Sequence, residues 1–114
     1  MAQVSSSVPS IVNFFAKKGD TFLRKINYTE NDVLTDVSGY TIIFQIRDER
    51  DNSLIATGTV AHLATGVFTI EVDDTITADL AKCRYNHELE FTTPSGYKRT
   101  IFTGKINFQE DIVQ

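Results

Sequence analysis

The sequence predicts an all-β fold, a small antiparallel β-sandwich of about seven strands with one short helical turn. Three observations lead to this prediction. Val, Ile, Thr, Phe and Tyr supply 46 of the 114 residues, whereas Leu and Ala supply only 13, and this balance is typical of strands. Short apolar segments recur about every ten residues with turn signals between them. The length and the 41% hydrophobic content fit one globular domain.

Two strands are predicted near the start of the chain. Residues 11–17 are mostly apolar and end at the turn signal Lys18-Gly19-Asp20. In residues 21–28 the apolar side chains recur with the period of two that places them on one face of a strand. Arg24 falls on that same face. Its alkyl stem therefore either extends to the sheet edge or carries the charge to an acidic partner inside.

Residues 40–48 give the clearest alternation of the chain, with Tyr40, Ile42, Phe44 and Ile46 on one face. Ile43 lies on the opposite, polar face, which predicts that a partner covers part of the outer surface. Between turns at residues 30–32 and 36–39, we expect Val33 and Leu34 to plug one end of the core.

Strands are next predicted over residues 54–60 and 67–73. The alternation breaks in residues 74–81, where a single helical turn fits, with Ile76 and Leu80 packed inward at i, i+4.

The last two predicted strands form a hairpin. Tyr85, His87, Leu89 and Phe91 share the core face of the first. The turn at residues 93–96 contains Pro and Gly, which preset its dihedral angles. The return strand covers residues 97–108.

The two ends differ in composition from the rest. Residues 1–10 are small and polar, so we predict a flexible N-terminal arm there and a single β-sandwich domain over residues 11–114. The arm is either an untethered terminus or a segment that docks on a neighbouring subunit. It lacks the basic start and apolar core of a secretory signal, so we expect the chain to fold in a cytoplasm.

Charge and composition argue against several classes of partner. The formal net charge is −4 and the longest clusters of basic residues are pairs, a poor match to a nucleic-acid or membrane surface. The apolar runs are too short to span a bilayer.

Few residues could carry chemistry. Cys83, the single cysteine, is interpreted as a half-buried apolar residue. His62 and His87 lack the spacing of a zinc site, and we interpret them as one surface and one half-buried histidine. Glu88 and Glu90 lie on the outer face of one strand, where Lys98 or Arg99 would be cross-strand partners. We therefore expect no enzyme, no metal site and no cofactor.

The order of the turn and core motifs resembles a known group of proteins. The motifs lie in residues 18–22, 36–48, 65–80, 84–90 and 94–106. Together they resemble the small immunoglobulin-like virion proteins of tailed bacteriophages and are similar to the N-terminal domain of baseplate upper proteins. The resemblance covers residues 18–113 and implies an immunoglobulin-like sandwich.

The resemblance also implies a structural role in a virion assembled in the host cytoplasm. The protein would form or decorate a ring of the tail, neck, collar, baseplate or portal and anchor neighbours such as fibres. Its partners would be copies of itself and other virion proteins. The candidate contact residues are Ser5, Ser6, Ser7, Val8, Pro9, Ser10, Ile43, Tyr97, Ile112 and Val113. The alternative is a carbohydrate- or receptor-binding adhesin module, for which Tyr97 is the one exposed aromatic candidate.

Overall fold

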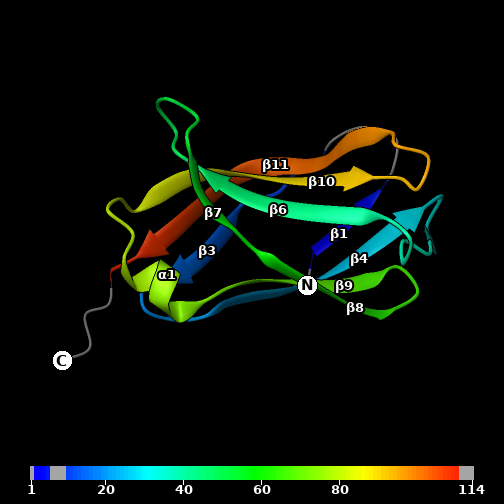
Figure 1. Cartoon of the computed structure of the whole chain (residues 1–114). Helices are drawn as coiled ribbons and strands as arrows, with labels where there is room; N and C mark the ends of the chain where they lie inside the picture. The colour runs from blue at the N-terminus through cyan, green and yellow to red at the C-terminus, as the bar shows by residue number, and fades with distance from the viewer. Residues whose placement is uncertain (1, 6–9, 111–114) are drawn as a thin grey trace.

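Two β-sheets pack face to face in the computed structural model, which describes residues 2–5 and 10–110 (Figure 1). The first sheet has the order β1 (Ala2–Ser5), β4 (Phe22–Glu30), β9 (Val67–Val72) and β8 (Thr59–Ala64), with β5 (Val33–Leu34) paired to β4. The second sheet has the order β2 (Ser10–Ile11), β11 (Lys98–Gln109), β10 (Arg84–Thr92), β6 (Thr41–Arg47) and β7 (Leu54–Thr57), with β3 (Phe14–Lys17) also paired to β11.

This strand order is that of an immunoglobulin-like sandwich. Strands β4, β9 and β8 take the places of B, E and D in one sheet, and β11, β10 and β6 take those of G, F and C in the other. One short helix, α1 (Asp74–Ala78), follows β9 in the described part of the chain. The predicted all-β sandwich with a helical turn is confirmed.

Aromatic side chains from both sheets fill the core. The inward faces predicted from the alternation are buried in β4, β9 and β10, and so are Phe44 and Ile46 of β6. Phe14 and Phe22 make an edge-to-face contact with ring centroids 5.3 Å apart, a favoured geometry for aromatic pairs. The buried aromatic residues are Phe14, Phe22, Tyr28, Phe44, Phe68, Tyr85, Phe91, Phe102 and Phe108.

The strands near the N-terminus pair in parallel, unlike the rest of the sandwich. β1 pairs parallel with β4, whereas β2 and β3 pair parallel with β11. The sequence predicts an arm over residues 1–10, but the described part of that range lies in strands. The strand expected over residues 11–17 is interrupted at Val12 and Asn13, between β2 and β3.

Gly58 marks the point where the chain passes from one sheet to the other. The sequence predicts one strand over residues 54–60, but β7 pairs with β6 in the second sheet and β8 with β9 in the first. The Gly58 N–H donates to the Phe44 carbonyl at 2.8 Å. A Cβ at Gly58 would lie 2.9 Å from the Phe44 ring. The crossing therefore needs a residue without a side chain.

Three side chains that the sequence predicts in the core are exposed instead: Val33, Leu34 and Ile76. Val33 and Leu34 form the short strand β5, and their side chains are 65% and 43% exposed. In α1 it is Thr77 that is buried, whereas Ile76 is exposed and Leu80 is buried as predicted. The Thr77 hydroxyl donates to the Asp20 carbonyl at 2.7 Å and accepts from the Gly19 N–H at 3.1 Å. Thr77 thereby holds the β3–β4 turn against the helix.

No helix in the described ranges has the length and apolar character needed to cross a membrane.

Candidate interaction surfaces

The predicted contact residues at the ends of the chain lie mostly beyond what the structure describes. Ser5 ends β1 on the first sheet, and Ser10 begins β2 on the second. These two belong to different sheets. The remaining predicted residues lie outside the described ranges: Ser6, Ser7, Val8, Pro9, Ile112 and Val113.

The two internal candidates lie on separate surfaces. Ile43 is half-buried on the outer face of the second sheet, where its neighbour on β10 is Glu90. Tyr97 is 76% exposed beside the turn between β10 and β11. The structure therefore offers two internal surfaces: the outer face of the second sheet and the loop end of the sandwich.

A buried histidine ties the segment between β2 and β3 to the second sheet. His87 on β10 is 2% exposed and stands opposite Gly104 on β11. Its Nε2 lies 2.6 Å from the Val12 carbonyl oxygen, so Nε2 carries the proton and donates. Asn13 Oδ1 accepts from the Lys105 N–H at 2.9 Å. Together these bonds replace the regular ladder that is missing at residues 12 and 13.

Burial governs the charge of this histidine. It lowers the pKa of His87 from 6.5 to about 4, and the bond to Val12 offsets only part of this effect. Nδ1 has no hydrogen-bond partner among the described residues. The sequence predicts a half-buried residue, but the ring packs within the core against Phe14, Phe44 and Phe102. His62 is exposed, as expected.

The outer face of the second sheet carries a groove of about 420 Å³. Asn86 and Glu88 of β10 and Thr103 and Lys105 of β11 contribute to its lining, and Ile11 of β2 stands at its edge. We call this feature the outer-face groove. Most of its lining residues are polar or charged, so the groove offers hydrogen-bonding groups along with the apolar parts of these side chains.

The loop between β6 and β7 bends over the outer-face groove. Glu49 Oε2 accepts from Lys105 Nζ at 2.8 Å and from Arg84 Nε at 2.9 Å. The Lys105 bond is the main reason that the pKa of Glu49 lies below its usual value. Lys105 also donates to Asn86 Oδ1 at 2.6 Å. One carboxylate thus joins the loop to both hairpin strands.

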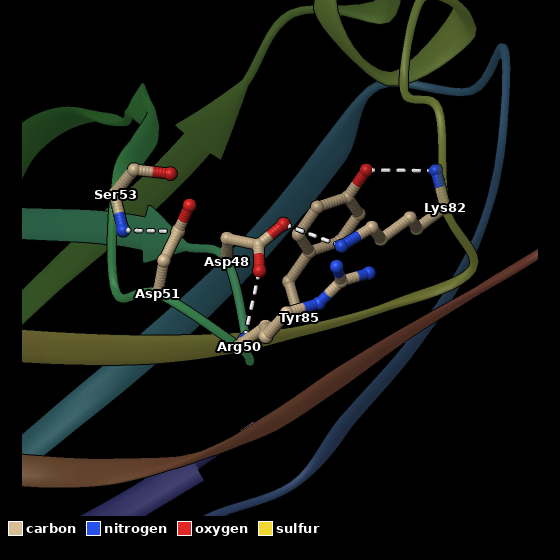
Figure 2. A network of polar contacts seen from close by, with 6 residues as sticks. All are labelled: Asp48, Arg50, Asp51, Ser53, Lys82 and Tyr85. Atoms are coloured by element: carbon tan, nitrogen blue, oxygen red, sulfur yellow. Dashed lines mark hydrogen bonds and ion pairs between the residues drawn. The ribbon is translucent and has the colours of Figure 1, made fainter.

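A second network holds the other side of this loop (Figure 2). Asp48 accepts from Lys82 Nζ at 2.7 Å and from the Arg50 N–H at 2.7 Å, while Lys82 donates its backbone N–H to the Tyr85 hydroxyl at 2.9 Å. The Lys82 bond is the main cause of the lowered pKa of Asp48. The carboxylates of this acidic loop are therefore structural acceptors that fix its shape.

Neutralising Asp48 should loosen the loop. In Asp48→Asn the charge-assisted bond from Lys82 is lost, and we expect a lower urea midpoint with faster amide exchange over residues 48–53. Asp51→Asn is the matched control, because Asp51 accepts only a local bond from the Ser53 N–H at 3.0 Å among the contacts that Figure 2 draws. Exchange measured by mass spectrometry checks the difference. Equal effects of the two variants would contradict the anchoring role of Asp48.

The opposite end of the sandwich holds a smaller hollow of about 230 Å³, which we call the end pocket. Tyr28 and Phe91 are its buried aromatic residues, and Tyr40 and Tyr97 stand beside them. Figure 1 shows the β10–β11 turn, the end of β4 and the β8–β9 turn gathered at this end, away from α1.

A β-bulge supplies the polar side of the end pocket. Leu89 pairs with Phe102 and Glu90 with Thr100, so Ile101 is the extra residue on β11. The bulge shifts the alternation, and Arg99 therefore stands on the core-facing side opposite Phe91. Its Nη2 donates to the Tyr28 hydroxyl at 2.5 Å, and this hydroxyl lies 3.4 Å from Glu30 Oε2.

The same register corrects the expected ion pairs of the hairpin. Glu88 on β10 faces Thr103 on β11, and Glu90 faces Thr100, not Lys98 or Arg99 as predicted.

The prediction that Cys83 is half-buried is also wrong, because its side chain is exposed. No cluster of three or more His, Cys, Asp or Glu side chains suited to a metal occurs within residues 2–5 and 10–110.

Two apolar side chains on the N-terminal strands point away from the core. Ile11 on β2 is 75% exposed and Phe15 on β3 is 70% exposed, large values for such residues.

The sequence left open whether the Arg24 stem extends to the sheet edge or carries the charge to an acidic partner inside. The guanidinium donates to the Phe15 carbonyl at 2.6 Å and lies 4.6 Å from the centre of the Phe22 ring. The stem thus extends outward and the charge bonds to backbone.

Comparison with protein-family models and with curated proteins finds no match. Among solved structures, the chain is similar to the N-terminal domain of phage TP901-1 ORF48. The TM-score is 0.61 at 13% identity, and the alignment covers 96% of this chain and 99% of that one. Similarity is lower to CopC from Methylosinus trichosporium OB3b (TM-score 0.49, 13% identity, 95% and 90% covered) and to the fibronectin(III)-like modules of Clostridium thermocellum CbhA (0.42, 13%, 95% and 95%). At this identity the likeness to the phage domain establishes a shared fold over nearly the whole of both chains.

Proposed function

We propose that this chain is a non-enzymatic structural component of a tailed-phage virion. It forms or decorates a ring of the tail, collar or baseplate and anchors neighbouring proteins such as fibres. The observation that carries the proposal is the match over nearly the whole length to the N-terminal domain of a phage protein. The turn and core motifs of the sequence support it independently, because they resemble immunoglobulin-like virion proteins. Fold alone does not determine function, so the proposal needs a direct test.

The contacts of this role are assigned to the outer face of the second sheet and its N-terminal edge. Ile11 and Phe15 expose large apolar surface there, and Ile43 lies on the same face. The outer-face groove adds hydrogen-bonding groups beside them. Exposed apolar side chains beside hydrogen-bonding groups are a composition that suits a protein–protein interface. Residues 5–10, Tyr97, Ile112 and Val113 remain proposed contacts of the arm, hairpin and tail.

Quantitative mass spectrometry of purified particles tests the proposal. We expect the chain in particles of the phage or prophage that encodes it, at a fixed copy number that fits a closed ring. Deletion of residues 1–10 should reduce incorporation if these residues dock on a neighbour, and the melting temperature of the shortened chain must be measured beside it, because residues 2–5 also pair with β4. Absence of the chain from particles would overturn the structural role.

A charge placed on the exposed edge should block assembly without unfolding the domain. Phe15→Glu is expected to prevent incorporation into particles, because burying a carboxylate against a partner is costly. Its melting temperature should stay near that of the parent, since Phe15 is solvent-exposed. Leu23→Glu is the matched control: Leu23 is an exposed apolar residue on β4 of the other sheet. Normal incorporation of Phe15→Glu would place the contact elsewhere.

A further inference from the structure

The end pocket combines features that the proposed virion role does not use. It lies at the loop end of the sandwich, and its lining residues come from β4 of the first sheet and from the β10–β11 hairpin of the second. Its aromatic residues come from β4, β10 and the segments beside β6 and β11. At about 230 Å³ it is smaller than the roughly 300–1,000 Å³ of typical ligand pockets, so it has room for one small ring.

We propose that the end pocket binds an acidic saccharide, with one sugar ring against the tyrosines and its carboxylate or phosphate at Lys98 and Arg99. This inference does not rest on the virion role. A sugar ring presents an apolar C–H face that packs on aromatic rings, and hydroxyls that need both donors and acceptors at its edge. Tyr97 and Tyr40 supply the aromatic surface, and Glu30 supplies an acceptor beside the donors of Arg99.

Charge selects an anionic sugar over a neutral one. The chain carries a net charge of −4, yet the lining of the end pocket holds two basic residues, Lys98 and Arg99, and a single carboxylate, Glu30. Glu30 lies within 3.4 Å of the Tyr28 hydroxyl. Arg99 gives one N–H to that hydroxyl, and its fork geometry offers several more donors suited to a carboxylate or phosphate.

The surroundings of Tyr97 fix its backbone before any ligand binds. The Thr93 N–H donates to the Tyr97 carbonyl at 2.8 Å, and the Tyr97 N–H donates to Thr93 Oγ1 at 3.1 Å. The Gly96 N–H closes the turn onto the Thr93 carbonyl at 2.9 Å. A two-torsion aromatic side chain on a fixed backbone loses little conformational entropy on binding. The exposed position of Tyr97 is thus a prepared binding surface.

An extended peptide is a poorer fit to the same pocket. Peptides that add to a sheet need a row of unpaired main-chain groups along a strand edge. β10 pairs with β11 and with β6 and so has no free edge, and β11 leaves only residues 98–101 without a strand partner on its other side among the described residues. Four residues are a short edge for an added strand, so recognition at the end pocket comes mainly from its side chains.

Titration of the full chain, labelled with ¹⁵N and followed by NMR, tests this proposal. Glucuronic acid, glucose 6-phosphate and glucose are the three probes. We expect glucuronic acid, the phosphate sugar or both to shift amides of residues 28–30, 40 and 91–99, and glucose to bind about tenfold more weakly because it lacks the charge. Equal binding of glucose, or no shifts at these residues with either acid, would overturn the proposal.

Matched variants separate the pocket from nonspecific binding. Tyr97→Ala should abolish the shifts and Lys98→Ala should weaken binding about tenfold. Phe15→Ala removes an equally exposed aromatic residue from the N-terminal edge and should bind like the parent. Particle incorporation of Tyr97→Ala is a separate measurement, so failure of sugar binding leaves the virion proposal standing. Loss of binding in Phe15→Ala to the same extent as in Tyr97→Ala would refute the assignment.

Discussion

Replacing Gly104 by alanine is expected to destabilise the protein by about 2–4 kcal/mol, which lies at the upper end for a single added methyl group. An ideal Cβ at this position would stand 2.7 Å from the Val12 carbonyl carbon and closer still to its oxygen. The obstacle is backbone, which cannot rotate away as a side chain can. The clash can be relieved only if the segment between β2 and β3 leaves the second sheet.

Urea unfolding and amide exchange check this expectation. Gly104→Ala should lower the free energy of unfolding and expose the amide of Val12, which now donates to the Thr103 carbonyl at 2.8 Å. Gly39→Ala is the control, since its added Cβ would meet only Pro94 Cγ at 3.4 Å, and we expect a change within about 0.5 kcal/mol. A Gly104→Ala protein as stable as the parent would show that residues 12 and 13 do not press on β11.

The second large effect is a loss of stability between pH 6.5 and pH 4 that comes from His87. Burial holds the folded-state pKa at about 4, below the ordinary value of 6.5. In this window the unfolded chain binds a proton that the folded chain does not, so stability falls as the pH falls. The difference of about 2.5 pKa units amounts to roughly 3 kcal/mol across the whole window. The contribution of the neutral His87 to stability is fully present above pH 6.5.

Urea unfolding at a series of pH values measures this slope, and the imidazole pKa follows from NMR. His87→Phe should remove the slope between pH 6.5 and 4.5. It should also lose about 1–2 kcal/mol at pH 7, because the Val12 carbonyl then lacks its donor. The carboxylates with lowered pKa, such as Asp48 and Glu49, lose their contribution only at lower pH. A slope that survives in His87→Phe would contradict the assignment.

Alternation in the sequence was enough to predict which faces of the strands form the core. Residues 85, 87, 89 and 91 alternate inward on β10 as expected, and the same holds for β4 and β9. The period of two fixes a face because successive side chains in a strand point to opposite sides. The period does not tell which strand lies beside a given strand. It therefore could not predict that the chain passes from one sheet to the other at Gly58.

The surfaces were harder to predict because they depend on small irregularities. The bulge at Ile101 lies within a run of residues that all favour strands, so no local signal marks it. It reverses the side on which Arg99 stands and so creates the polar half of the end pocket. Val33 and Leu34 are exposed although they are apolar, because apolar character alone does not guarantee burial. Tyr97 was found because a Gly-containing turn beside an aromatic residue predicts exposure.

The parallel pairing of β3 with β11 bears on how the domain would carry mechanical load. Phe14 pairs with Ile106 at one end of this contact and Lys17 with Gln109 at the other. Tension applied at residue 10 and residue 110 would therefore pull the two strands in opposite directions along their length. All the hydrogen bonds between them resist such shear together, whereas a hairpin pulled at its open end breaks them one at a time. A domain with this parallel strand pair is therefore suited to resist a force applied between residues 10 and 110.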